Sequence, residues 1–283
     1  MNVTDEHLLA FSSQPFWDIS VKWQTELFLD AEIYRVTRYD MMPNTISLNT
    51  IPGFGQVGLI FSVCENIPRA YIYGVLAENI MLKQHINHAL LIHFRPGIFT
   101  KIMGVPSSEI PADGIALDDV IPWSRQYIEM INSVDNETLH INYLSEFLNI
   151  CFNKLSPVSI GTGSSQKVTG IELSCNIADY MKLNRKLIKV SDLEDEFYYS
   201  KRTIENIVIR DIGISPKQLN LQTCLQTSIQ VIKSDPQCNI SDLSSALQFH
   251  DQAHFGKFFK KMTGVTPAQF KKMFYNSNDE NND

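Results

Sequence analysis

The sequence predicts an α+β protein of two domains, an N-terminal antiparallel sheet or barrel with helices and a C-terminal all-α domain. Residues 43–99 are rich in β-branched and aromatic residues and are interrupted by turn residues, as in short antiparallel strands. Residues 168–275 instead carry apolar residues at three- and four-residue spacing. The Gly/Ser-rich stretch SPVSIGTGSSQK separates the two patterns. The predicted parts are a domain at 1–155, a linker at 156–167, a domain at 168–275 and a disordered acidic tail at 276–283.

Composition limits the class of protein. The chain has 283 residues, of which 44% are hydrophobic, so it can bury a sizeable core. Its net charge of −7 is uneven, because residues 1–166 carry −8, residues 167–275 carry +4 and the last eight residues carry −3. A basic segment between acidic ones weakly favours a nucleic-acid face. The five cysteines form no CxxC pair, which argues against a disulfide framework or a zinc ribbon. With neither a signal peptide nor a membrane span expected, the prediction is a cytoplasmic protein.

The N-terminal half contains one clear strand and two later helices. In ALLIHFRPG the residues alternate, so that His93 and Arg95 share one face and Leu90, Ile92 and Phe94 share the other. The following GIFTKIMGVPSSEI predicts a short helix ended by Gly104 and Pro106. A helix begins near Trp123, Tyr127 and Met130, and a second carries an apolar stripe through Ile141, Leu144, Leu148, Cys151 and Leu155. That stripe is either core or a dimer seam.

The C-terminal half contains the same pattern twice. VSDLEDEF predicts a short helix with a capping box formed by Ser191 and Glu194, and a three-residue break leads to KRTIENIVIR, which Ser200 can cap. ISDLSSAL predicts a second short helix, followed by a break and QAHFGKFFKKM, which Asp251 can cap. A long helix over residues 217–233 joins the two. The prediction is therefore two helix-turn-helix units joined by a single helix.

The apolar spacing shows which side of each longer helix faces outward. The later helix carries an inward apolar stripe at i, i+3, i+4 and i+7, formed by Phe255, Phe258, Phe259 and Met262. The earlier helix has an inward apolar face formed by Ile204, Ile207 and Val208. Polar and cationic side chains then point out. Such a face suits the major groove, because Arg can bond guanine with two donors, Asn or Gln can bond adenine, Glu can accept from cytosine, and lysines contact phosphates.

The C-terminal half of the sequence resembles a known protein family. ISDLSSALQFHDQAHFGKFFKKMTGVTPAQFKK resembles the second half of the DNA-binding domain of the AraC/XylS family, and SDLEDEFYYSKRTIENIVIRDIGISPKQL resembles the first half. The resemblance covers roughly 167–275. It implies two recognition helices in successive major grooves. The DNA-binding positions that it implies, together with the outward cations, are Lys201, Arg202, Glu205, Asn206, Gln252, Ala253, His254, Lys257, Lys260 and Lys261.

Two departures from the family pattern bear on geometry. Both turns commonly carry glycine in a left-handed conformation, but Tyr198 and Gln248 stand at those positions here. Ile209 occupies an outward position where the family often has a cation, which predicts weaker phosphate contact in the first unit. His254 either contacts DNA or packs beside Phe255.

The N-terminal half also shows a resemblance. FRPGIFTKIMGVPSSEIPADGIALDD, residues 94–119, is similar to a segment of the sensor domains of AraC-type regulators. The resemblance implies a cupin-like β-barrel followed by dimerising helices. His93 and Arg95 could meet an anionic effector inside it, or Arg95 could pair with an acid at the rim. His85, His88 and His93 lie close in sequence, but no acid completes a metal triad, so neither a metal nor another cofactor is expected.

The sequence therefore predicts a bacterial, nucleoid-associated transcription regulator of the AraC/XylS type, more often an activator in this family, and not an enzyme. Its expected partners are double-stranded promoter DNA, a second copy in a homodimer, RNA polymerase and a small-molecule effector, without a membrane. No nucleophile elbow or phosphate loop appears in the sequence. The alternative is a ligand-binding or metal-dependent cupin-like protein whose helical domain mediates protein contacts.

Overall fold

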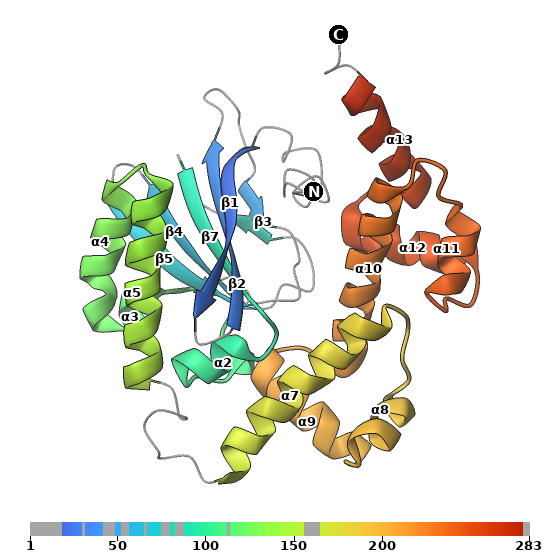
Figure 1. The fold of residues 1–283 in the computed structure, drawn as a ribbon, viewed down its shortest axis with the longest axis horizontal. Coiled ribbons are helices and arrows are strands. Elements are labelled where there is room, and N and C mark those ends of the chain that lie inside the picture. The colour runs from blue at the N-terminus through green and yellow to red at the C-terminus, as the bar shows by residue number, and fades with distance from the viewer. Residues whose placement is uncertain are drawn as a thin grey trace.

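The structure is a computed structural model that describes residues 19–29, 32–41, 49–51, 57–64, 67–74, 80–82, 88–111, 114–155 and 165–279. Two bodies are visible in Figure 1, a sheet covered by helices and an arc of helices that begins with α7 (Ser165–Asn184). The helix α7 begins inside the predicted linker, so residues 165–167 are helical rather than part of it. The rest of that linker lies outside the described residues.

The main sheet has six strands in the order β1-β2-β7-β4-β5-β8, and every neighbouring pair is antiparallel. The strands are β1 (Ile19–Leu29), β2 (Glu32–Met41), β4 (Gly58–Cys64), β5 (Ile67–Tyr73), β7 (His88–Phe94) and β8 (Ile115–Ala116). A separate ladder pairs β3 (Asn49–Ile51) with β6 (Ile80–Leu82). The described strands thus form an open sheet and a small second ladder. The cupin-like barrel expected from the sequence is not closed within this part of the chain.

The predicted alternation along β7 is present, and it separates two buried faces of the sheet. Leu90, Ile92 and Phe94 belong to the main N-terminal core, where they pack beside residues of the helices. Leu91 and His93 alternate with them and are also buried. Arg95 follows the end of the strand. The sheet therefore buries side chains on both faces.

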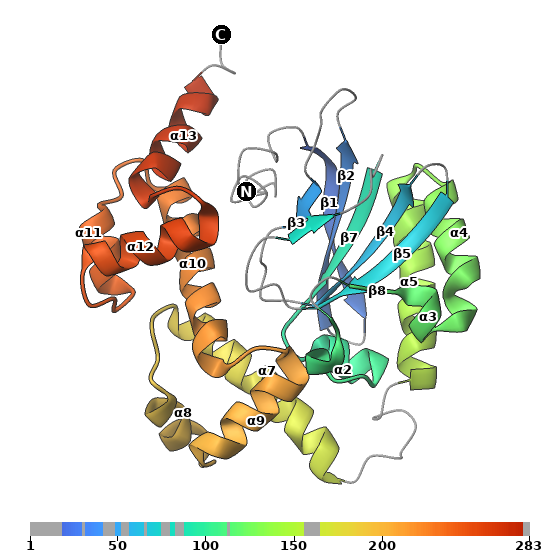
Figure 2. The ribbon, with the colours of Figure 1, turned by 180° about the vertical axis from the view of Figure 1, so that it is seen from behind.

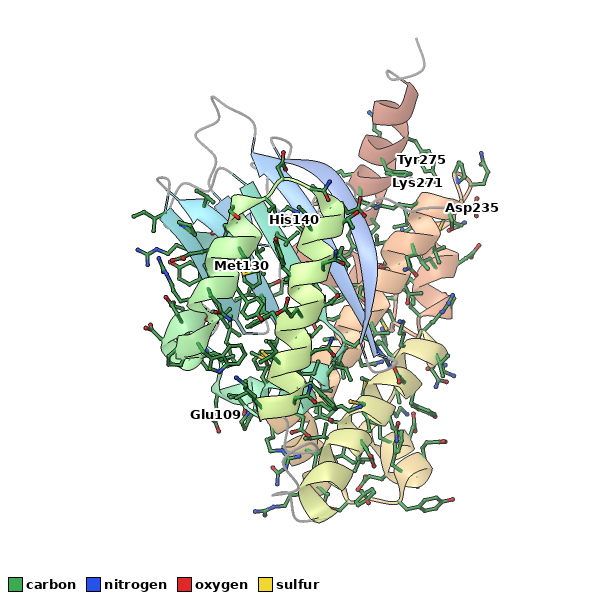
Figure 3. All side chains as sticks on the ribbon, turned by 60° about the vertical axis from the view of Figure 1, so that its left-hand side comes forward. Glu109, Met130, His140, Asp235, Lys271 and Tyr275 are labelled. Atoms are coloured by element: carbon green, nitrogen blue, oxygen red, sulfur yellow. The ribbon has the colours of Figure 1, made fainter. Side chains whose placement is uncertain are left out.

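Helices cover one face of this sheet. A short helix α2 (Ile98–Met103) ends at Gly104 in a left-handed conformation, as predicted, and a 3₁₀ turn η2 (Ser107–Glu109) follows. After α3 (Leu117–Val120) and η3 (Pro122–Ser124) come α4 (Arg125–Ser133) and α5 (Glu137–Leu155). Figure 3 shows α4 and α5 side by side, with Met130 on the first and His140 on the second.

The stripe on α5 lies in the core. Leu144, Leu148 and Cys151 are fully buried, and Ile141 and Leu155 pack against the same cluster from its margin. Phe147 joins them and meets Phe61 of β4 edge to face. Of the two interpretations left open by the sequence, the stripe itself serves as core. A dimer contact on this helix would have to use its outer side.

The C-terminal body contains α8 (Val190–Phe197), α9 (Lys201–Ile212), α10 (Pro216–Ser234), α11 (Ile240–Ala246), α12 (Gln252–Thr263) and α13 (Pro267–Asp279). The helix α10 is the predicted connector. The helix α13 runs to Asp279, so residues 276–279, expected in the tail, are helical. None of the helices in the described part of the chain has the length and apolar composition needed to cross a membrane.

The two halves of the C-terminal body are joined by more than α10. The side-chain amide of the buried Asn220 on α10 donates to the Lys186 carbonyl at 2.9 Å and accepts from the Ile188 amide at 2.8 Å. Between these, the Leu187 amide donates to the carbonyl of Leu247, at the end of α11. The segment before α8 is therefore bound both to the connecting helix α10 and to the second unit. The first unit also faces the N-terminal domain, because α7 and α9 pack against α2 and η2 (Figure 2).

Candidate DNA-binding surface

The first helix-turn-helix unit is formed by α8 and α9. The Ser200 hydroxyl accepts a hydrogen bond from the Thr203 amide at 3.3 Å and so caps α9, as predicted. The predicted capping box of Ser191 and Glu194 is wrong, because α8 starts at Val190 and its N-cap is Lys189, two residues before Ser191. Asp192 accepts from the Lys189 amide instead, at 3.1 Å. The Glu194 carboxylate accepts from the Lys201 amide at 2.7 Å and ties α8 to the start of α9.

The second unit, α11 and α12, is built in the same way. Asn239 caps α11 by accepting from the amides of Ser241 and Asp242. Asp251 caps α12 by accepting from the His254 amide at 2.6 Å, which confirms the predicted cap. This hydrogen bond, together with a second one from the His250 ring, lowers the pKa of the Asp251 carboxyl. The carboxylate is therefore ionised where it faces the positive end of the helix dipole.

Both turns contain a left-handed residue that is not glycine. Tyr198 has φ 58° and Gln248 has φ 62°, as their places in the sequence predict. The Tyr198 amide still donates to the Glu194 carbonyl at 2.9 Å, so the end of α8 keeps its hydrogen bond. The turns therefore keep the left-handed conformation, and the non-glycine residues at these positions carry backbone strain.

Apolar residues fix both longer helices from behind. On α9, Ile204 and Val208 are fully buried in a cluster with residues of α7, and Ile207 packs at its margin. On α12, Phe255 and Phe259 are fully buried beside α10 residues, with Phe258 and Met262 at the margin. Stacked, edge-on or tilted ring contacts link Phe249, Phe255, Phe258, Phe259 and Phe270. The predicted inward faces are therefore confirmed.

The opposite faces point to solvent. On α9 the side chains of Lys201, Arg202 and Asn206 are exposed and Glu205 is half-buried. On α12 the predicted residues are all exposed, namely Gln252, Ala253, His254, Lys257, Lys260 and Lys261. The ring of His254 meets Phe249 edge to face at 5.4 Å while staying exposed, so it packs beside Phe249 and not Phe255. The fold brings each set together on one helix face.

The two helices correspond residue for residue, and this correspondence reveals an electrostatic difference. Each spans 12 residues, with caps at Ser200 and Asp251 and C-caps at Gly213 and Gly264, so Ile209 and Lys260 occupy equivalent positions. Ile209 is 43% exposed. On α9 the Lys201 ammonium lies 3.9 Å from Glu205, and the Arg210 guanidinium binds both carboxylate oxygens of Asp211. On α12 the three lysines share the helix with no acidic residue. The second unit therefore presents the stronger positive field.

The predicted effector residues of the N-terminal domain contact different partners. His93 is buried, and its Nδ1 lies 3.2 Å from the Tyr73 hydroxyl. The Arg95 guanidinium donates to both carboxylate oxygens of Asp179 at 2.7 Å. The acid that pairs with Arg95 thus comes from α7 and not from a barrel rim, a contact that local sequence spacing could not indicate.

The metal interpretation finds no support among the described residues, where no group of three or more His, Cys, Asp or Glu side chains is placed to hold an ion. The side chains of His85 and His88 lie outside the described part of the chain.

Comparison with known proteins agrees with the C-terminal geometry. A protein family described as a helix-turn-helix domain matches residues 193–273, which run from α8 into α13. A comparison with curated proteins finds no match. Similar solved structures include ToxT from Vibrio cholerae O395, at 13% identity and TM-score 0.40, covering 91% of this chain and 94% of that one. The unsaturated fatty acid-bound ToxT from Vibrio cholerae strain SCE256 is similar at 14% identity and TM-score 0.39, with 90% of each chain covered.

These structural likenesses are weak, so the assignment rests on the C-terminal domain. That domain combines the matched helix-turn-helix region with the repeated unit, the F-x-D-Q-x-H-F segment and two outward-facing polar helices. The C-terminal domain accordingly contains a helix-turn-helix domain over residues 193–273, and its sequence resembles the DNA-binding domain of the AraC/XylS family.

Proposed function

We propose that the chain reads two successive major-groove segments of promoter DNA, one with α9 and the other with α12. The observation that carries this proposal is the repeated presentation of a capped 12-residue helix, buried on its apolar side and polar or cationic on the other. A helix of this kind fits the major groove with its N-terminal side chains toward the bases.

The exposed residues divide into base-reading and phosphate-binding roles. Arg202 donates to guanine, Asn206 and Gln252 bond adenine, and Ala253 is small enough to lie against a thymine methyl group. Glu205 accepts from cytosine or orients Arg202, and His254 adds a base or phosphate contact beside Phe249. The lysines at 201, 257, 260 and 261 bind phosphate oxygens, which positions the helices without selecting sequence.

The N-terminal domain serves as the sensor and dimerisation domain in this proposal. The sheet face opposite the helices buries polar groups, namely Ser62, Tyr73 and His93. A small-molecule effector with an oxygen-rich head group would find hydrogen-bonding partners there. An effector of this kind acts only if it binds one arrangement of the protein better than another. The outer sides of α4 and α5 form the homodimer contact, and the bound dimer recruits RNA polymerase as an activator.

A salt titration of DNA binding tests the DNA-reading role. Genomic fragments are selected on the purified full-length protein, and the retained fragment is titrated in gel shifts at several salt concentrations. Phosphate contact predicts that log K falls linearly with log salt, at about 0.9 per neutralised phosphate. The absence of a salt-sensitive shift would favour the alternative, a helical domain that mediates protein contacts.

A further inference from the structure

The C-terminal end of α9 is completed by the N-terminal domain. The last carbonyl groups of an α-helix lack partners inside the helix. The carbonyl of Asp211, in the last turn of α9, accepts a hydrogen bond from the Thr100 hydroxyl of α2 at 3.0 Å. Thr100 and Asp211 are both buried, at 5% and 0% exposure, so water does not compete for this contact. A side chain from one domain thus caps the recognition helix of the other.

The capping hydroxyl is itself held in place. The Thr100 hydroxyl has a single proton, which it donates to the Asp211 carbonyl. The Ser107 hydroxyl, 3.0 Å away, therefore donates to the Thr100 oxygen. The Ser107 amide also donates to the Thr100 oxygen, at 3.0 Å. Thr100 therefore has one orientation, with its proton directed at α9.

The same turn of the N-terminal domain is fastened to α7. The Arg95 guanidinium binds Asp179, and Gly97 between Arg95 and Thr100 lies so close to α7 that a side chain there would clash with the Cys175 sulfur at 2.7 Å. Gly97 also has φ 83°, which L side chains rarely adopt. The turn from β7 into α2 is thus shaped to lie against the first helix-turn-helix unit.

We propose that the N-terminal domain controls DNA reading through the first helix-turn-helix unit, by capping its recognition helix and fastening α7. This proposal rests on the DNA-reading role of α9. The contacts described between the domains fall on α7 and α9, whereas α12 packs against α11 and α13 and shares a hydrophobic cluster with α10. The strand β7 runs from the buried His93 directly into this turn, so a change at the sheet reaches α9 through Arg95, Gly97 and Thr100.

The division of charge between the units fits this arrangement. The lysines of α12 supply sequence-independent affinity. On α9, Lys201 lies near Glu205 and Arg210 is bound to Asp211, so the first unit depends more on positioning of its base contacts. Loss of the cap on α9 should therefore reduce the discrimination between bases read by α9 and leave the overall affinity for DNA nearly unchanged.

Two variants and two controls test the proposal. Thr100→Val keeps the shape of the side chain and removes the hydroxyl, while Thr100→Ser keeps the hydroxyl. Asp179→Asn removes the charge that Arg95 binds. Tyr275→Phe is the matched control, because the Tyr275 hydroxyl donates to the carbonyls of Ile232 and Lys233 and so caps α10 inside the C-terminal domain (Figure 3).

The probe is the genomic fragment retained by the wild-type full-length chain, with base substitutions placed in the part read by either unit. We expect Thr100→Val and Asp179→Asn to lower discrimination about two- to tenfold at bases read by α9, as for the loss of one hydrogen bond, and not at bases read by α12. Amide hydrogen exchange should accelerate in the last turn of α9 and not in α12. Thr100→Ser and Tyr275→Phe should behave like the wild type at the bases read by α9.

Unchanged discrimination, or an equal loss at both sets of bases, would overturn the proposal. If Thr100→Val fails to fold because the Ser107 amide also loses its acceptor, Asp179→Asn carries the same test. A failure of the DNA-reading role is recognised separately, because the wild-type chain would then bind no fragment with sequence preference. Hydrogen exchange would still report whether Thr100 caps α9.

Discussion

At the scale of single residues, the two recognition helices present different chemistry on a shared framework. Position 209 carries an isoleucine where the equivalent position 260 carries a lysine, and an aspartate binds the guanidinium of Arg210. The two hydrogen bonds that the Arg210 guanidinium donates to the Asp211 carboxylate raise the pKa of Arg210 above its already high ordinary value. Arg210 is therefore engaged by Asp211, and in our proposal Arg202 is the arginine directed at DNA.

The first prediction concerns base reading. Arg202→Ala should relax sequence preference at one base position by roughly 1–3 kcal/mol, because the side chain can make two hydrogen bonds to guanine. Binding titrations with a fragment substituted at each position in turn would measure this. An equal loss of affinity for specific and random DNA would remove Arg202 from the base-reading set.

The second prediction concerns phosphate contact and uses the equivalence of positions 209 and 260. Lys260→Ala should weaken binding to all sequences and lower the salt slope by about one unit. Ile209→Lys should do the opposite and raise the slope by about one unit, because it places a cation at the same point of the first unit. Gel shifts at several salt concentrations measure both slopes. A salt slope that neither substitution alters would show that this helix position does not face phosphate.

At the scale of elements, the two turns show how the repeated unit tolerates a departure from the family pattern. Tyr198 and Gln248 adopt the left-handed conformation although each has a side chain. Tyr198 is 91% exposed, so its side chain contributes little packing that could offset the strain. The strain is local, since the hydrogen bonds around both turns are present.

The third prediction follows from this strain. Tyr198→Gly or Gln248→Gly should raise the free energy of unfolding by about 1 kcal/mol, because glycine adopts positive φ at little cost. Urea unfolding of the full-length chain measures the change. Gln230→Gly, at an exposed position inside α10, is the control and should lower stability by about 1 kcal/mol. A loss of stability in both turn variants would mean that their side chains make compensating contacts.

At the scale of the whole molecule, each domain has its own core and its own buried thiol. Burial raises the pKa of Cys151, in the N-terminal core, and of Cys224, in the C-terminal core, to about 12. A buried thiol with so high a pKa reacts only when its domain opens.

The fourth prediction uses these thiols as reporters. In the native protein at pH 8, Cys151 and Cys224 should resist alkylation, while the half-buried Cys175 reacts faster. Rising urea should then expose Cys151 and Cys224, and mass spectrometry of the labelled peptides gives the opening of each domain separately. Rapid labelling of Cys151 or Cys224 without denaturant would contradict the packing of that core.

The sequence by itself determined the elements whose signals are local. The caps at Ser200 and Asp251 and the inward phenylalanines follow from side-chain chemistry within a few residues, whereas the left-handed turns were expected from the resemblance to the AraC/XylS family; the structure contains them all. The helix α7 begins, and the helix α13 ends, inside stretches that the sequence predicted as linker and tail, because a polar or Gly/Ser-containing stretch can still be helical. The sequence could not predict whether the sheet closes into a barrel, since the alternation of residues along a strand does not determine how strands pair.

Only the tertiary structure decided which distant residues meet. Arg95 and Asp179 are 84 positions apart and Thr100 and Asp211 are 111 apart, and no periodicity links them. Such contacts depend on how two separately folded surfaces dock. The outward-facing residues of α9 and α12 were therefore readable from helical spacing, whereas the contact that joins the N-terminal domain to α9 appeared only when the chain was folded.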